Sequence, residues 1–190
     1  WVAELLADAG LPPDVLQVVT GGPEIGAAVV DAVDAVVFTG STRSGRQVAA
    51  QAGARMIPTT LELGGKNGVY VADDVDPVAT ASGLVRTCFA GVGQVCVTAE
   101  RLYVHEAVYD EVVEAFVAAT AALRLGAGLD YRAELGSLSS AAQLARVVEH
   151  VEDAVGAGAR VLAGGEQRPD LGPYFYAPTI LADVPAEALL

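Results

Sequence analysis

The stretch Ala35–Gly45, AVVFTGSTRSG, decides the fold. Its first residues form an apolar run of strand length, which is typical of a strand covered on both faces. Gly40 and Ser41 then form a turn, and the pattern after them predicts a helix over Arg43–Ala52. A buried strand that enters a helix through a glycine is the repeating unit of a protein with a parallel sheet.

Strands and helices alternate on both sides of this stretch. The sequence predicts further strands over Leu16–Thr20, Ile57–Leu63, Gly68–Val71, Arg101–His105, Arg160–Ala163 and Tyr176–Leu181. It predicts further helices over Trp1–Ala9, Glu24–Val33, Asp76–Ala90, Ala107–Leu123 and Ala141–Ala157. This alternation indicates the α/β class with a largely parallel sheet, and the texture changes near Gly91–Gln94.

The composition is that of a globular protein with an acidic surface. Of 190 residues, 53% are hydrophobic and 18% charged, and the formal net charge is −13. Lys and Arg form no run that could track a phosphate backbone, so we expect no nucleic-acid partner. The apolar runs fall short of the ~20 residues that a membrane span needs, and no secretory signal precedes them, so we expect no membrane partner.

The two cysteines, Cys88 and Cys96, are too few for a disulfide framework. Their spacing with His105 and His150 matches no common zinc pattern, so we expect no metal site. A reducing cytoplasm is the simplest compartment for such a chain.

The turn Gly40–Ser41 is a candidate phosphate site. It lies between a strand and a helix, where free backbone N–H groups and the helix dipole favour anions. The stretch is not the GxGxxG fingerprint, and a plain serine N-cap after a tight turn explains it equally well.

Glu62, in LELGG, is a candidate general base. It stands at the end of a predicted strand, and Gly64 and Gly65 follow without side chains that could block a flat ligand. Flanking leucines would remove water from the carboxylate and favour a base. The alternative is an ordinary ion pair with Lys66 at the strand end.

Cys96, in GQVC, is a candidate nucleophile. It follows Gly93 and Gln94, and the glycines on its N-terminal side allow an exposed, sharply turned backbone, whereas Cys88 lies in a helical apolar pattern and is expected in the core. No histidine is placed to complete a Cys–His pair, so a hydrolytic thiol enzyme is disfavoured. A thiol, a base and a phosphate turn together suggest redox chemistry through a thioester.

Three blocks give the chain a family resemblance: FTGST with Gly45, then LELGGKN, then GQVC followed by Glu100–Arg101 and Tyr103–Val104. They resemble, in order and approximate spacing, the signature blocks of the NAD(P)-dependent aldehyde dehydrogenase superfamily. The resemblance extends over the whole chain, with succinate-semialdehyde dehydrogenase-type members most similar. Gly68 departs from it, because the family often has proline there.

The resemblance assigns a role to each motif residue. It implies that Cys96 attacks the aldehyde and contributes its backbone N–H to an oxyanion hole, and that Glu62 activates the water that hydrolyses the thioester. The residues that it assigns to NAD or NADP are Phe38, Gly40, Ser41, Gly45, Leu63 and Gly64.

The resemblance also implies an organisation. Residues 1–92 would be part of a Rossmann-like parallel-sheet cofactor domain, and residues 93–190 part of an α/β catalytic domain. The chain would be an internal fragment, inactive alone, of a cytoplasmic homodimer or homotetramer that oxidises a small aldehyde. Two alternatives stay open at this point: an acylating relative, and a catalytically silent structural or binding module.

Overall fold

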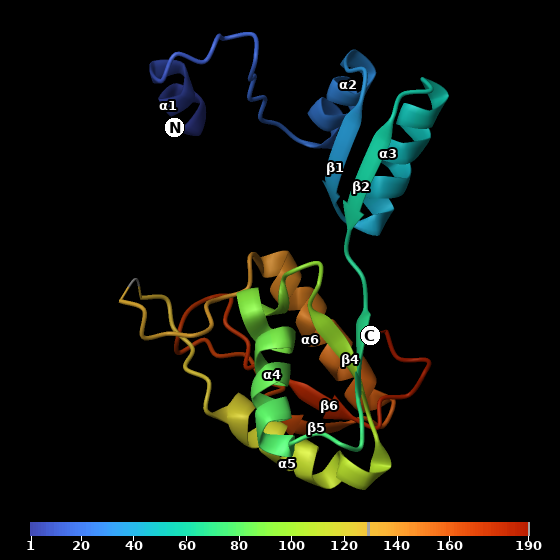
Figure 1. Ribbon diagram of the computed structural model, residues 1–190, viewed down its shortest axis with the longest axis vertical. Coiled ribbons are helices and arrows are strands. Elements are labelled where there is room, and N and C mark those ends of the chain that lie inside the picture. The colour runs from blue at the N-terminus through green and yellow to red at the C-terminus, as the bar shows by residue number, and fades with distance from the viewer. Residues whose placement is uncertain (129, 190) are drawn as a thin grey trace. The chain divides into compact units, whose positions relative to one another are not determined.

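The computed structural model describes residues 1–128 and 130–189 (Figure 1). The chain forms two compact units, Trp1–Gly64 and Gly65–Leu190. This division concerns packing, and the functional boundary expected between residues 92 and 93 stays a prediction. The elements are mixed helix and strand, and two of the three strand pairs are parallel, as the α/β prediction requires.

The first unit is built on one strand–helix–strand crossover. Its elements are α1 (Val2–Asp8), α2 (Pro23–Ala32), β1 (Val36–Gly40), α3 (Thr42–Ala54) and β2 (Thr59–Leu63). β1 and β2 pair in parallel, and α3 packs against both strands and against α2. Gln51 of α3, and Arg55 directly after α3, donate side-chain hydrogen bonds to carbonyl groups of α2 and of the residue after α2.

Two expectations for the first unit need correction. Leu16–Thr20 has no strand structure, because the segment has no hydrogen-bonded neighbour there, and Val18 and Val19 are exposed. β1 is not covered on both faces within this chain: Val36 and Phe38 are half-buried, whereas Val37 is 77% exposed. The apolar run is therefore a strand with one face open here.

The second unit begins with a parallel pair and ends with an antiparallel pair. Its elements are β3 (Asn67–Val71), α4 (Pro77–Phe89), η1 (Ala90–Gly93), β4 (Ala99–Val104), η2 (Glu106–Val108), α5 (Tyr109–Ala121), α6 (Ala141–Gly156), β5 (Arg160–Ala163) and β6 (Ile180–Ala182). β3 pairs with β4 in parallel, and β5 pairs with β6 antiparallel. The predicted strand Tyr176–Leu181 is shorter than expected, because Tyr176 forms only an isolated bridge with Gln167.

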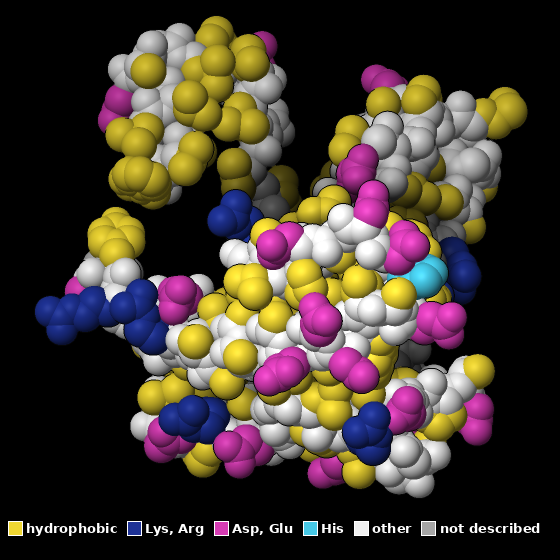
Figure 2. All heavy atoms as spheres, turned by 60° about the horizontal axis from the view of Figure 1, so that its bottom comes forward, with side chains coloured by type: hydrophobic (Ala, Val, Ile, Leu, Met, Phe, Trp, Pro, Cys, Tyr) yellow, Lys and Arg dark blue, Asp and Glu magenta, His cyan; other side chains and the backbone are white. Residues whose placement is uncertain are grey.

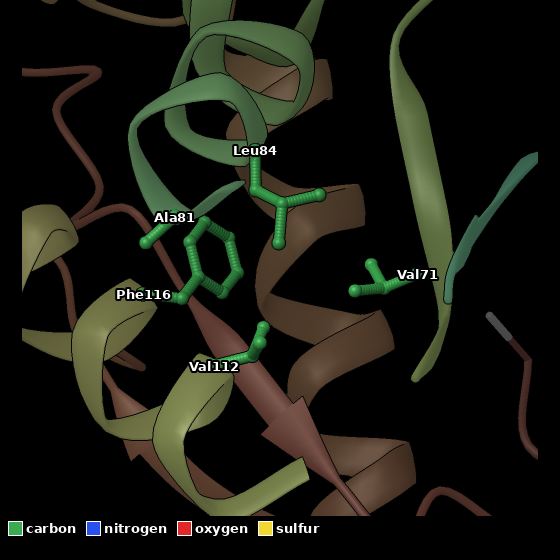
Figure 3. Close-up of a cluster of buried hydrophobic side chains, with 5 residues drawn as sticks. All are labelled: Val71, Ala81, Leu84, Val112 and Phe116. Atoms are coloured by element: carbon green, nitrogen blue, oxygen red, sulfur yellow. The ribbon is translucent and has the colours of Figure 1, made fainter. Parts of the chain in front are cut away.

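The core of the second unit lies between α4, α5 and β3. Figure 3 shows Ala81 and Leu84 of α4 facing Val112 and Phe116 of α5, with Val71 of β3 beside them. Burial of such side chains is worth about 1.5–3 kcal/mol each, before the cost of ordering the chain. The space-filling view shows acidic side chains scattered among apolar ones over this unit (Figure 2).

Candidate active site

The carboxyl edge of the β1–β2 pair holds the motif residues of the first unit. In the parallel register, Thr39 lies opposite Glu62 and Gly40 lies opposite Leu63. The turn after β1 and the glycine pair after β2 therefore leave the sheet at the same edge. Ligands of open parallel sheets bind at this kind of edge.

Ser41 caps α3. Its Oγ accepts a hydrogen bond from the backbone N–H of Ser44 at 3.1 Å and donates one to Ser44 Oγ at 3.1 Å. The N-cap interpretation of this turn is therefore confirmed. An anion could still approach, because the first turn of a helix has further N–H groups without intrahelical partners.

Two glycines of this edge lie in close contact with apolar side chains. A Cβ on Gly45 would stand 2.6 Å from Leu63 Cδ2, so glycine at this buried position lets α3 approach β2. A Cβ on Gly40 would stand 2.6 Å from the ring of Phe38. The ring of Phe38 thus lies over Gly40 at the end of β1, and the side chain of Leu63 lies over Gly45 in α3.

Glu62 is exposed on the other face of β2. Thr59, Leu61 and Leu63 are half-buried, whereas Thr60 and Glu62 are exposed, as the two-residue period of a strand dictates. The first unit itself therefore does not remove water from this carboxylate, contrary to the expectation from its leucine neighbours. The ion pair considered as an alternative is not the one formed, since Lys66 Nζ pairs with Glu100.

Cys96 lies in an exposed loop between η1 and β4. Gly91, Val92 and Gly93 precede it with φ values of 61°, 62° and 70°. Left-handed backbone is unusual for a β-branched residue such as Val92, and it reverses the chain sharply before the cysteine. The sharp turn predicted from the glycines is present.

Hydrogen bonds fix both ends of this loop. Asn67 Nδ2 donates to the carbonyl oxygens of Cys96 at 2.9 Å and Thr98 at 3.1 Å. Gln94 Oε1 accepts from the backbone N–H of Ser139 at 2.9 Å. The cysteine side chain is exposed while the backbone that carries it is held.

Cys88 has the opposite environment. It is half-buried on α4 and packs against the core cluster, as predicted. Burial, with a smaller contribution from the negative charge of Glu100, raises the pKa of its thiol to about 11. Cys88 is therefore a neutral thiol at physiological pH.

The candidate residues divide between the two units. Glu62 and the expected cofactor residues lie together in the first unit, and Cys96 lies in the second. That Glu62 and Cys96 lie close together stays a prediction.

Within residues 1–128 and 130–189, no group of three or more His, Cys, Asp or Glu side chains could hold a metal ion. No helix in the same ranges has the length and hydropathy for a bilayer span.

The chain belongs to the aldehyde dehydrogenase family, whose model matches residues 1–190. A Mycolicibacterium smegmatis protein with the provisional name succinate-semialdehyde dehydrogenase (NADP+) is 46% identical over 97% of this chain and 36% of its own length. Glutarate-semialdehyde dehydrogenase of Pseudomonas aeruginosa is 42% identical over 100% of this chain and 40% of its own length.

Solved structures show the same fold. Succinate-semialdehyde dehydrogenase from Burkholderia pseudomallei superposes with a TM-score of 0.92 at 38% identity, over 98% of this chain and 39% of that one. The chain therefore spans well under half the length of the relatives that it matches.

The sequence prediction missed the residues that hold the cysteine loop. Asn67 and Gln94 both stand inside the quoted motifs, but neither received a role. The available signal was an amide side chain one residue after the motif lysine and another two residues before the cysteine. Sequence spacing alone does not say which backbone groups such amides reach.

Proposed function

We propose that the complete protein oxidises an aldehyde to a carboxylic acid with NADP+, using Cys96 as nucleophile and Glu62 as general base. Family membership and the similarity to an NADP+-named relative support the reaction class and the cofactor. The observation that carries the residue assignment is the contrast between exposed Cys96 and half-buried Cys88, whose pKa is raised to about 11.

The first half-reaction uses the sulfur of Cys96. The thiolate adds to the aldehyde carbon and forms a thiohemiacetal, while the backbone N–H of Cys96 donates to the oxygen that becomes negative. One such donor is worth a few kcal/mol in the transition state. When bound, NADP+ supplies the acceptor for the hydride that leaves this carbon, and Cys96 is left as a thioester.

The second half-reaction uses the carboxylate of Glu62. It removes a proton from water, the water oxygen attacks the thioester carbon, and the carbon–sulfur bond breaks. The products are a carboxylic acid and the free thiolate of Cys96. A base that activates water favours hydrolysis over transfer of the acyl group to another thiol.

The cofactor residues of the first unit fit a dinucleotide phosphate. α3 is 13 residues long and begins at the glycine–serine turn, so its N-terminus presents N–H groups and a positive dipole end to an anion. Gly40 and Ser41 would hold the phosphate, with Gly45 beneath the turn. Phe38, Leu63 and Gly64 would border the cofactor at the same edge.

The substrate that we propose is a semialdehyde with a terminal carboxylate. Relatives named for succinate semialdehyde and glutarate semialdehyde support this class. A comparison of kcat/KM for succinate semialdehyde with that for uncharged butanal tests it. A preference for the charged substrate is expected, and equal values would contradict the proposal.

The remaining expectations concern the whole protein. We propose that residues 1–92 serve the cofactor and residues 93–190 the thiol chemistry, in a cytoplasmic homo-oligomer without nucleic acid. The family resemblance and the small number of cysteines support this. Light scattering of the complete protein should give a dimer or tetramer, and a monomer would contradict the oligomer.

Paired cysteine variants of the complete protein test the assignment. Cys96→Ala should abolish NADPH formation with succinate semialdehyde, because it removes the sulfur that adds to the aldehyde carbon. Cys88→Ala should retain NADPH formation and serves as the matched control. Activity that survives Cys96→Ala, or that is lost only with Cys88→Ala, would refute the proposal.

A further inference from the structure

The side chain of Asn67 holds the backbone of the candidate nucleophile. Its amide nitrogen has two hydrogens, and these reach two carbonyl oxygens of the same loop, those of Cys96 and Thr98, at 2.9 and 3.1 Å. Carbonyl oxygens only accept hydrogen bonds, so the nitrogen of the amide must face them. The donor capacity of this nitrogen is used fully.

Asn67 occupies a break in the strand ladder. It is the first residue of β3, opposite Ala99, and the register shifts between Asn67 and Gly68. At such a bulge the backbone hydrogen bonds are disrupted locally. The side chain of Asn67 donates instead to carbonyl groups of the loop that leads into β4.

The backbone of Asn67 is itself fixed by its neighbours. Arg101 Nε donates to the carbonyl oxygen of Lys66 at 2.9 Å, and Lys66 Nζ pairs with Glu100. The motif segments around Lys66–Asn67 and Cys96–Arg101 are therefore joined by three independent side chains. The loop is closed further by a hydrogen bond from Thr98 N–H to Val95 O at 3.0 Å.

We propose that Asn67 is a positioning residue for Cys96. A fixed carbonyl at Cys96 fixes the plane of the following peptide, and with it the place and direction in which the Cα–Cβ bond leaves the backbone. The exposed thiol is then carried on a fixed stretch of backbone without being buried. This inference rests on the proposed function, and it adds a role that acts through the loop backbone without contact with the substrate.

A purely structural role predicts something different. If Asn67 only secured the end of β3, its replacement would lower stability but leave the chemistry of the folded enzyme unchanged. The positioning role predicts a lower first-turnover rate in protein that is folded, because a misplacement of about 1 Å can cost 10²-fold.

The experiment compares three variants of the complete protein at one position. Asn67→Asp keeps the shape but replaces the donor with an acceptor, Asn67→Ala removes the group, and Asn67→Gln keeps an amide donor on a longer chain. The matched control is Gln51→Ala. Gln51 also makes two amide hydrogen bonds, to Ala27 O and Asp31 Oδ1, but it lies in the last turn of α3 in the first unit.

Two readouts are measured on each variant. The first is the pre-steady-state rate of NADPH formation in the first turnover, with the KM for the aldehyde. The second is amide hydrogen exchange of the peptide that covers residues 94–98, which needs no activity. Asn67→Asp and Asn67→Ala should lower the first-turnover rate about 10²-fold with a much smaller change in KM, and should accelerate exchange at least ~10-fold.

Asn67→Gln should lose less of the first-turnover rate than Asn67→Asp, and Gln51→Ala should change neither readout. Unchanged exchange and rate in Asn67→Asp would overturn the inference, as would equal losses in Asn67→Asp and Gln51→Ala. The two proposals can fail separately. Faster loop exchange in a protein that oxidises no aldehyde refutes only the proposed function, whereas an active, Cys96-dependent enzyme insensitive to Asn67→Asp refutes only the positioning role.

Discussion

Cys88 and Cys96 are the same residue type in two opposite environments. Cys88 packs under α4, where burial raises the pKa of its thiol to about 11 from an ordinary 9.0. Cys96 extends from a loop whose backbone is held by Asn67. This contrast is the reason for choosing Cys96 over Cys88 as the candidate nucleophile.

The alkylation of Cys88 should depend on pH in a particular way. A raised thiol pKa means that the folded state keeps its proton where the unfolded state loses it. The free energy of unfolding is therefore unaffected by this thiol below about pH 9, and it falls as the pH rises from 9 through 11, because only the unfolded state then releases the proton easily. At pH 8 the raised pKa lowers the thiolate fraction of Cys88 about 100-fold relative to an ordinary thiol.

Iodoacetamide labelling followed by peptide mass spectrometry measures this. In the complete folded protein at pH 8, Cys96 should be labelled first and Cys88 only slowly, and the rate at Cys88 should climb until the pH passes 11. In denaturant the two rates should become similar. Faster labelling of Cys88 than of Cys96 in the folded protein would contradict the assignment of both residues.

At the scale of elements, the sequence predicted most helices and the strands that find partners. β1, α3 and β2 follow from AVVFTGSTRSG and TTLEL, because a glycine turn, a serine cap and a two-residue period are local signals. Leu16–Thr20 has the residue types of a strand, but its hydrogen bonds depend on a neighbour that local sequence does not specify. The strand predicted over Tyr176–Leu181 is shorter in the structure for the same reason.

α5 buries the polar side chain of Thr120. Thr120 is 2% exposed, and its Oγ1 has no hydrogen-bond partner in the part of the chain that the structure describes. A buried hydroxyl without a partner costs about 1–3 kcal/mol. Thr120→Val keeps the shape and should raise the free energy of unfolding by about 1 kcal/mol.

Urea unfolding followed by circular dichroism measures the change. Thr87→Val is the matched control, since Thr87 is exposed on the neighbouring helix α4 and should change the free energy little. A loss of stability in Thr120→Val would mean that this hydroxyl is in fact hydrogen-bonded.

At the scale of the whole molecule, the two units differ in how much core they contain. The buried hydrophobic residues of the first unit are Val30 and Ala52, whereas Val37 of β1 and Met56, between α3 and β2, are exposed. The second unit contains the cluster around Phe116. A two-stranded sheet with little core is marginally stable in water.

Hydrogen exchange of the isolated 190-residue chain should show this difference. Amides of residues 1–64 should exchange at least ~100-fold faster than those of α4 and α5, because local opening costs less where fewer apolar contacts must break. Equal protection of the two units would contradict the burial argument.

The sequence offers candidates for the site, but it does not say how they assemble. Three motif blocks nominate Cys96, Glu62 and the turn at Gly40–Ser41, since each is a local pattern of residue types. The hydrogen bond from Asn67 to the carbonyl oxygen of Cys96 joins residues far apart in the chain, and it depends on the register of β3 and β4. The environment of Glu62 likewise depends on what faces the open side of β2, which no local pattern encodes.

The central claim is that Cys96 carries the acyl group that Glu62 then helps to hydrolyse. Acid-quenched mass spectrometry of the complete Glu62→Gln protein, mixed with succinate semialdehyde and NADP+, tests it directly. The account predicts one burst of NADPH and a succinyl thioester on the peptide that contains Cys96, with Cys88 unmodified. No adduct at Cys96 despite NADPH formation, or an adduct on Cys88, would contradict the account.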